Sequence, residues 1–422
     1  MPEVLTPRNY VARPFEPMST TLRDGLQSPL WNDYKRFYPT PEEMVKIFRA
    51  EIQLGVRFFE FFSPIVSERA AEDMNTIIRA RDETRLVHPH PIFVMAHARV
   101  DYKDVETALA AGVDGLNLYF GTSDVSLESK HSKPISIEDV AKKTRELIED
   151  IRKRYPDIWI RFSGEDAFRT DPEKLFTVYD TLQELVDAVG TPDTVGGANP
   201  DQVARRVALL KRRYPNLHLE GHFHNDRSFA LINALVALKE GMGFIDTSVL
   251  GVAERSGISS LTGLLLNVDI ERPDLLDGFD LIHSYALNVL LADIMQMQVP
   301  STELVNATHR THYAGVHASA VLKDPRTYEE HDLARFGVDR STLLLGPLSG
   351  RNSVHYYLTQ FLNYGEMSAE VLTQITSEFK TITTNIPKGH GVNISLDDIL
   401  DALAQKHGLT KIKEPETHIE NL

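Results

Sequence analysis

The sequence predicts an α/β protein built on a (β/α)8, or TIM, barrel and followed by a mostly helical C-terminal region. Short β-branched or aromatic runs alternate with helix-like stretches over roughly 250 residues, which is typical of a parallel sheet. Eight such runs can be distinguished, the number that closes this barrel. Polar side chains follow nearly every run, where the loops of such a barrel build its active site.

The candidate strands and their helices follow one another in regular order. Thr40 and Pro41 begin the first helix with a capping residue and a proline at the first position, and Asn199-Pro200 repeats this start. The first helix carries apolar residues along one face and ends near Gly55. The eight candidate strands are Met18–Leu22, Val56–Phe62, Ile92–Ala96, Gly115–Phe120, Ile158–Phe162, Ala188–Thr191, Leu217–His222 and Phe244–Leu250.

Beyond about residue 290 the pattern becomes helical. A polar, histidine-rich connection from Val299 to Gly350 has the composition of a lid or linker, and the tail after Lys411 is expected to fray. The predicted helices are Tyr285–Met297, Ser353–Asn363, Ala369–Thr383 and Leu396–His407, the last with Ser395 as its cap and Gly408 as its stop. The predicted parts are an N-terminal extension (1–17), the catalytic barrel (18–290), a linker or lid (291–350) and a helical C-terminal subdomain (351–422).

Composition excludes several classes of protein. The 422 residues include 45 basic and 60 acidic side chains, so the net charge of −15 makes nucleic acids and acidic lipid surfaces unlikely partners. The chain has no cysteine, which excludes disulfides, thiolate metal sites and cysteine nucleophiles. No apolar run approaches the length of a membrane span, and the N-terminus lacks the apolar segment of a signal peptide. We therefore expect a cytoplasmic protein that binds no membrane.

A candidate metal site combines two strand ends. His222 and His224 alternate at the end of the seventh candidate strand, so both imidazoles face the same side. Asp24 ends the first, and one carboxylate with two imidazoles leaves positions open for a chelating substrate on a divalent cation. The alternatives are two structural histidines and a surface ion pair between Arg23 and Asp24.

A second cluster follows the fifth candidate strand. Arg161, Ser163 and Glu165 alternate, so they point into one space, where the arginine and hydroxyl suit a carboxylate ligand and Glu165 suits a base. The alternative for Glu165 is a buried ion pair with Arg161 or Arg169. Outside the barrel, His312 and His317 have the composition of surface histidines in a linker, and we expect His88 and His90 to be loop residues only.

Taken together, these motifs resemble the family of acetyl-CoA-dependent condensing enzymes that includes homocitrate synthase, 2-isopropylmalate synthase and citramalate synthase. Thr21–Gln27 resembles the opening signature of the family, Gly221–Asp226 its metal motif and Thr247–Arg255 its GxGER segment. Homocitrate synthases are the most similar branch. The segments that resemble theirs are Phe62–Pro64 (TSP), Arg161–Arg169 (RFSxEDxFR), Ser256–Leu261 (NGITPL) and His312–Tyr328 (the lid motif).

The resemblance implies a reaction and a set of roles. Acetyl-CoA would condense with a 2-oxo acid, 2-oxoglutarate first, on a bound Mg²⁺, Mn²⁺, Zn²⁺ or Co²⁺, before hydrolysis of the thioester. In this family the lid comes from the neighbouring subunit, so a homodimer is expected. The implied metal ligands are Asp24, His222 and His224, the substrate-binding residues Arg23, Gln27, His97, Arg161, Ser163 and Thr194, and the catalytic residues Glu165, His317, Tyr328 and Arg23.

Three positions depart from the homocitrate synthase pattern. Asp24 stands where these enzymes usually have glutamate, and Ser228 and Ala253 replace two glycines. These changes leave the acceptor open among 2-oxoglutarate, 2-oxoisovalerate, pyruvate, oxaloacetate and phosphonopyruvate. Two other functions also stay open. One is a carbon–carbon lyase on the same barrel, although such lyases use a loop cysteine that this chain lacks, and the other is a metal-binding barrel without turnover.

Overall fold

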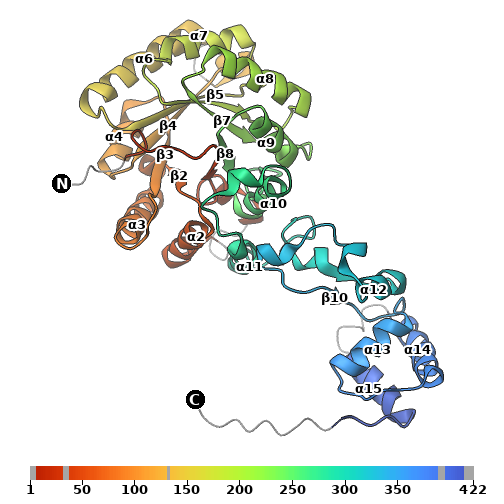
Figure 1. Cartoon of the computed structure of the whole chain (residues 1–422). Helices are drawn as coiled ribbons and strands as arrows, with labels where there is room; N and C mark the ends of the chain where they lie inside the picture. The colour runs from red at the N-terminus through yellow and green to blue at the C-terminus, as the bar shows by residue number, and fades with distance from the viewer. Residues whose placement is uncertain (1–5, 32–37, 131–133, 388–394, 413–422) are drawn as a thin grey trace. The chain divides into compact units, whose positions relative to one another are not determined.

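The structure is a computed structural model that describes residues 6–31, 38–130, 134–387 and 395–412. The chain divides into two compact units, one ending at Val305 and the other beginning at Asn306. The first unit is a closed parallel barrel in which the eight strands follow one another in chain order. Figure 1 shows its helices arranged around the strands. The predicted fold class is therefore confirmed.

Each predicted strand segment overlaps one strand of the barrel, and the last strand pairs with the first, Met18 lying opposite Asp246. The first strand ends earlier than predicted, because the carbonyl oxygen of Thr20 accepts hydrogen bonds from the N–H groups of Arg23 and Gly25 and the chain turns. The strands are β1 (Glu16–Ser19), β2 (Phe58–Phe62), β3 (Phe93–Arg99), β4 (Gly115–Gly121), β5 (Trp159–Glu165), β6 (Ala188–Asp193), β7 (His218–Phe223) and β8 (Phe244–Thr247).

Two helices of the first unit begin at the capping residues that the sequence indicates, Thr40 and Asn199. Thr40 and Glu43 form a capping box at the start of the first helix, and Asn199 and Gln202 form another. Gly55 ends the first helix with φ of 111°, a conformation that favours glycine. The helices are α2 (Pro41–Leu54), α3 (Glu68–Arg85), α4 (Tyr102–Ala110), α5 (Asp124–Ser129), α6 (Ile137–Arg154), α7 (Pro172–Leu182), α8 (Pro200–Arg213), α9 (Ala230–Lys239), α10 (Leu261–Glu271) and α11 (Ser284–Ile294).

The barrel interior changes from apolar to polar along the strands. At the N-terminal ends, the buried side chains pack into one cluster that Tyr10 and Ala12 cover. Side chains two residues further along a strand point to the same side, and there they are polar: Glu60 follows Phe58, and Arg161 follows Trp159. The apolar cluster is Met18, Phe58, Phe93, Met95, Trp159, Ala188 and Phe244. It forms a solid floor beneath the polar end of the barrel.

The second unit is mostly helical. Its two short strands pair in parallel, and its last three helices share a core that includes Tyr364, Ile375 and Phe379. Ser395 caps the last helix by accepting from the N–H of Asp398, as predicted. The elements are β9 (Thr311–His312), α12 (Gly315–Val321), β10 (Thr342–Leu343), α13 (Arg351–Gln360), α14 (Ala369–Thr384) and α15 (Leu396–Lys406).

The connection that precedes the second unit belongs to the barrel. Asn288 on α11 donates to Thr262 Oγ1 at 2.9 Å and to the carbonyl oxygen of Val305 at 3.0 Å. The division thus falls after Val305, later in the chain than residue 290. Among the described residues, no helix has the length and apolar character needed to cross a membrane. The predicted frayed tail falls mainly on residues 413–422, which lie outside the described residues.

Candidate active site and metal centre

A pocket of about 660 Å³ opens at the C-terminal ends of the barrel strands. All the site residues predicted within the first unit line it, although they come from different strands. They are Arg23, Asp24, Gln27, His97, Arg161, Ser163, Glu165, Thr194, His222 and His224. The apolar floor described above closes the other end of the barrel. The pocket therefore lies on the side of the barrel to which the strand-end loops belong.

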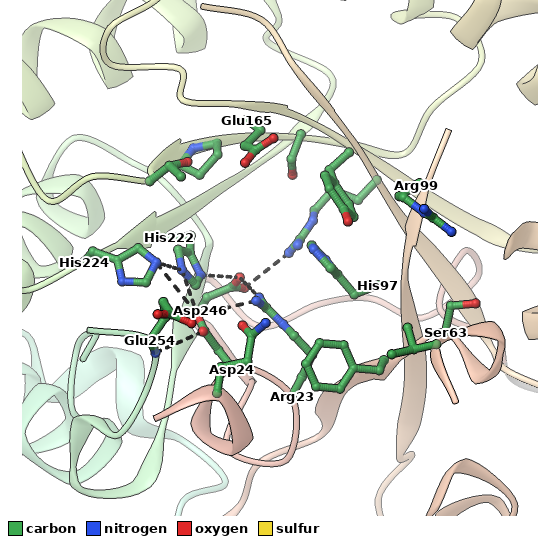
Figure 2. Close-up of a pocket in the computed structure, with 18 of the residues that line it drawn as sticks. Arg23, Asp24, Ser63, His97, Arg99, Glu165, His222, His224, Asp246 and Glu254 are labelled. Carbon is green, nitrogen blue, oxygen red and sulfur yellow. Dashed lines mark hydrogen bonds and ion pairs between the residues drawn. The ribbon is translucent and has the colours of Figure 1, made fainter. Parts of the chain in front are cut away.

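Asp24, His222 and His224 form a compact set of possible metal ligands. All three are buried, and Figure 2 shows them converging. His222 Nε2 lies 3.1 Å from Asp24 Oδ2 and 3.2 Å from His224 Nε2, and His224 Nε2 lies 3.9 Å from Asp24 Oδ2. Neighbouring ligands of a six-coordinate ion with bonds of about 2.1 Å are roughly 3 Å apart. The spacing and the nitrogen and oxygen donors therefore fit one divalent cation.

The surroundings of this set orient its members. Asp246 Oδ2 accepts a hydrogen bond of 3.0 Å from His222 Nδ1, which turns Nε2 toward Asp24. Burial lowers the pKa of His222, but the carboxylates of Asp24 and Asp246 outweigh it and raise that pKa to about 9. Burial and the neighbouring His222 lower the pKa of His224 to about 3. The Glu254 N–H donates to Asp24 Oδ1 at 3.3 Å.

Beneath the ligand set lies a layer of buried ion pairs. Arg23 contacts Glu60 at 2.7 Å, and Arg161 contacts Glu60 at 2.9 Å and Asp246 at 3.2 Å. Burial raises the pKa of Glu60, but Arg23, His97 and Arg161 outweigh that effect and hold the pKa well below its usual range. Charged and hydrogen-bonded on several sides, the two arginines are fixed in place at the base of the pocket.

Glu220 is a further carboxyl group in this layer. Burial, reinforced by the charge of Asp246, raises its pKa well above the usual range, although Glu220 lies 3.4 Å from Arg161, which acts to lower it. Gly190 on the adjacent strand leaves the room that Glu220 and Ser163 occupy, because a Cβ atom there would clash with both side chains. This glycine is thus needed for the close approach of the two side chains.

Glu165 ends β5 at the rim of the pocket. Its carboxylate lies 2.5 Å from the ammonium group of Lys130. The expected alternative, a pairing with Arg161 or Arg169, is not what the structure contains: Arg169 pairs with Asp166 at 2.6 Å, and Arg161 with the carboxylates described above. Lys130 was not predicted as a neighbour of the site.

His97, Thr194 and Gln27 provide neutral polar groups in the pocket. The ring of His97 stacks on Tyr119 with centroids 4.3 Å apart, and burial together with Arg23 lowers the pKa of His97. The Thr194 hydroxyl accepts the Asp166 N–H at 2.9 Å, which leaves its own proton free to donate. Gln27 is exposed at the rim.

His317 and Tyr328 belong to the second unit, whereas all the residues that line this pocket belong to the first. Their rings stack with centroids 4.1 Å apart, so the structure brings these two predicted residues together. Beside them, Glu329 accepts from Arg310 and from His312, each at 2.9 Å. His312 is therefore a buried partner of a carboxylate and not the surface histidine that its composition suggested. His88 and His90 are loop residues, as expected, His88 half-buried and His90 exposed.

Several residues of the site were missed from the sequence. Glu220 and Asp246 are acids inside strands that otherwise read as apolar, and Tyr119 faces His97 from the next strand. Strand alternation could have identified Glu220 as a site residue. Glu220 stands two residues before His222, so both side chains face the same side of the strand. Nothing local to Lys130 indicates its partner, which is 35 residues away.

This fold and pocket define a TIM-barrel enzyme whose polar residues gather at the C-terminal strand ends. A family model described as HMGL-like matches residues 15–310, and one described as "Homocitrate synthase post-HMGL domain-like" matches residues 304–386. The chain belongs to the HMGL-like family. It is an acyltransferase enzyme, and the resemblance seen in its motifs is confirmed.

Named relatives match most of the chain. The cytosolic homocitrate synthase isozyme of Saccharomyces cerevisiae is 32% identical over 414 residues, or 95% of this chain and 90% of that protein. Homocitrate synthase AksA of Methanocaldococcus jannaschii is 30% identical, covering 87% of this chain and 88% of its own. The 2-isopropylmalate synthase of Pyrococcus furiosus is also 30% identical, covering 88% of this chain and 73% of its own.

Solved structures of related folds resemble the barrel. The hydroxymethylglutaryl-CoA lyase of Pseudomonas aeruginosa has a TM-score of 0.56 at 19% identity, covering 71% of this chain and 97% of that one. The HMG-CoA lyase of Bacillus subtilis has a TM-score of 0.52 at 19% identity, covering 70% of this chain and 98% of its own. At these identities the likeness supports the fold alone.

Proposed function

We propose that the protein condenses acetyl-CoA with a 2-oxo acid, 2-oxoglutarate being the favoured acceptor, and then hydrolyses the thioester to release homocitrate and CoA. The observation that carries this proposal is the Asp24–His222–His224 set above two buried arginines, in a chain 32% identical to a named homocitrate synthase. A cytoplasmic location is part of the proposal. The yeast relatives are named as cytosolic and mitochondrial isozymes.

Asp24, His222 and His224 would hold one Mg²⁺, Mn²⁺, Zn²⁺ or Co²⁺, which supplies Lewis-acid chemistry at a carbonyl oxygen when bound. Their spacing and the hydrogen bond from His222 to Asp246 support this role. The same hydrogen bond keeps Nδ1 of His222 occupied, so Nε2 is the nitrogen available to a cation.

The acceptor would lie against the two arginines and the neutral polar groups. Arg23 and Arg161 face the pocket with cationic N–H donors, and Arg23 would also stabilise charge that develops on the acceptor during the reaction. Ser163 and Thr194 offer hydroxyl groups, and His97 a neutral imidazole. Gln27, at the rim, would contact the substrate from its exposed side. Such a set suits a small molecule with carboxylate groups at both ends.

Glu165 would accept a proton from the methyl group of acetyl-CoA, as a base within the proton-transfer pair that it forms with His317. The resulting carbanion attacks the keto carbon, whose oxygen takes up a proton to become the hydroxyl group. Water then cleaves the thioester and leaves a carboxylate and CoA. The stacking of His317 and Tyr328 supports a joint role for these two residues. As part of this proposal, the lid that carries them comes from the second subunit of a homodimer.

A second acceptor is favoured by two departures near the ligand set. Asp24 has a short side chain, and Ser228 adopts φ of 60°, where glycine is usual. Oxaloacetate or phosphonopyruvate, which are shorter dianions, would fit such a pocket. The reaction type is the same for each.

A thiol-release assay tests the proposal. Purified protein, acetyl-CoA and Mg²⁺ or Mn²⁺ are mixed in turn with 2-oxoglutarate, 2-oxoisovalerate, pyruvate, oxaloacetate and phosphonopyruvate, and free CoA is measured. We expect release with 2-oxoglutarate above the rate without acceptor, and a product of the condensed mass. No release with any acceptor would favour a barrel without turnover. Cleavage of 3-hydroxy-3-methylglutaryl-CoA would instead favour a lyase.

A further inference from the structure

Glu51 is an acid in an unusual place. It lies on α2, and its side chain is fully buried, with 0% of its surface exposed. No basic side chain among the described residues forms an ion pair with it, and its Oε2 atom has no hydrogen-bond partner there. An uncompensated buried carboxyl costs free energy, because it must either lose its hydration or take up a proton. The chain therefore retains a costly group at this position.

The hydrogen bonds of Glu51 lead to the end of β1 and to the loop that carries Asp24. Its Oε1 atom accepts from the Ser19 hydroxyl at 2.5 Å and from the Thr21 hydroxyl at 2.9 Å. With its proton directed toward Glu51, the Thr21 oxygen accepts the Val249 N–H at 3.1 Å. Ser19, Thr21 and Val249 are all buried, so water cannot replace these partners.

These contacts bear on the ligand set through two loops. Val249 lies in the loop after β8, and the same loop reaches Glu254, whose N–H donates to Asp24 Oδ1. Thr21 and Asp24 belong to the loop after β1. The two loops are thus joined at two points, by Thr21 with Val249 and by Asp24 with Glu254. Glu51 directs the proton of the Thr21 hydroxyl and so leaves the Thr21 oxygen able to accept the hydrogen bond from Val249.

We propose that Glu51 is a positioning residue for the Asp24 carboxylate, acting through the Thr21 hydroxyl and the loop after β8. The inference rests on the proposed metal site, because the effect of Glu51 is measured as a change in the affinity of that site for a metal ion. Glu51 itself contacts neither the pocket nor the ligand set. The role of Glu51 is to hold the loops after β1 and β8 in a fixed position relative to each other, so that Asp24 lies at the observed distances from the two imidazoles.

Metal affinity, measured without substrates, tests this role. Binding of Mn²⁺ or Co²⁺ is followed by electron paramagnetic resonance or by the visible absorption of Co²⁺, for Glu51→Leu, Thr21→Val and the double variant. We expect each single variant to weaken binding about tenfold, as for partners behind a metal ligand. The double variant should lose about tenfold and not a hundredfold, because both changes break one connection. Glu51→Gln, whose amide oxygen can accept from both hydroxyls, should restore affinity to within about twofold.

Glu16→Leu is the matched control. Glu16 is also fully buried and lies on β1, but it is bonded to Tyr10 and Arg13 at the opposite end of the strand. This change should lower stability while metal affinity stays at the wild-type value. A Glu51→Leu variant with wild-type affinity would overturn the role of Glu51. If that variant does not fold, Thr21→Val decides, because unchanged affinity in this variant also overturns the proposal.

A comparison of the wild type with His224→Ala separates this inference from the proposed function. If the wild-type protein binds Mn²⁺ or Co²⁺ no better than His224→Ala, the metal site itself is wrong, and with it the role of Glu51. If the wild type binds well and Glu51→Leu binds equally well, only the positioning role is wrong.

Discussion

His222 donates its Nδ1 hydrogen to Asp246 across 3.0 Å, and the opposite nitrogen of the same ring lies 3.1 Å from Asp24. The imidazole is therefore held between two carboxylates, one on β8 and one in the loop after β1. Because the strands are held by the barrel and the Asp246 carboxylate is buried, the ring has one orientation. A rigid ligand of this kind lowers the entropy cost of capturing a cation.

Removal of the metal should abolish activity. We expect excess chelator to stop CoA release and Mg²⁺, Mn²⁺ or a similar ion to restore it, because Asp24, His222 and His224 would then regain their shared ion. His224→Ala should lose the metal yet keep the circular dichroism spectrum of the folded protein. Full activity in excess chelator would rule out a metal-dependent reaction.

Glu165→Gln and His317→Ala should each lower kcat by about 10²–10⁴-fold, because both groups are proposed to transfer protons in the transition state. The affinity for the 2-oxo acid should change little, since neither variant removes a group that binds it. Steady-state kinetics with acetyl-CoA in excess measures both quantities. Equal losses in kcat and acceptor affinity would point to a binding role instead.

Mixing these two inactive variants tests the subunit arrangement. If the lid crosses between subunits, a heterodimer of Glu165→Gln and His317→Ala contains one intact site of its two. Activity should then return after subunit exchange, which differently tagged chains can verify. No recovery despite proven exchange would mean that each chain uses its own lid or none.

The acceptor preference follows from unpaired polar groups. An apolar acceptor such as 2-oxoisovalerate would leave some of His97, Ser163 and Thr194 without partners. Each buried unpaired group costs about 1–3 kcal/mol, or roughly ten- to a hundredfold in kcat/KM. We therefore expect 2-oxoglutarate to exceed 2-oxoisovalerate by at least that factor. A preference for 2-oxoisovalerate or pyruvate over every dianion would show that the pocket binds its acceptor differently.

Glu51 should make stability depend on pH. Burial raises its pKa to about 7, although the Ser19 and Thr21 hydroxyls act to lower it, whereas the glutamate of an unfolded chain titrates near about 4.3. Between these values the folded chain keeps a proton that the unfolded chain has released. The free energy of unfolding should therefore fall as pH rises through this window, by up to about 3 kcal/mol.

Glu51→Gln has no such proton, so urea unfolding between pH 4.5 and 8 should follow a flatter curve than for the wild type. The difference between the two proteins should grow with pH and favour the variant at pH 8. Parallel curves would mean that Glu51 has an ordinary pKa in the folded state.

The barrel could be predicted because its pattern is local. Neighbouring residues determine alternating strands and capped helices, as at Thr40 and Asn199, where both expected helix starts form, each with a capping box. The end of β1 could not be predicted in the same way. Thr20, Thr21 and Leu22 read as strand, but the Thr20 carbonyl oxygen accepts from Arg23 and Gly25, and this turn is held by contacts with the β8 segment.

In the candidate site, period-two alternation identified the residues on the inner side of each strand but not their partners. His222 and His224 were expected to converge with Asp24, and they do. That Arg161 meets Glu60 depends on how strands 101 residues apart are brought together by barrel closure. The same holds for Glu51, whose two hydroxyl partners lie on another element.

The contact between Lys130 and Glu165 should make the Glu165 carboxylate sensitive to the salt concentration of the solution. The lysine side chain is half exposed, so dissolved salt screens the attraction more strongly than it screens the buried arginine pairs. We therefore expect added salt to release the carboxylate at the end of β5 from Lys130 more often. If turnover depends on this release, its response to salt should be weaker in Lys130→Met than in the wild type.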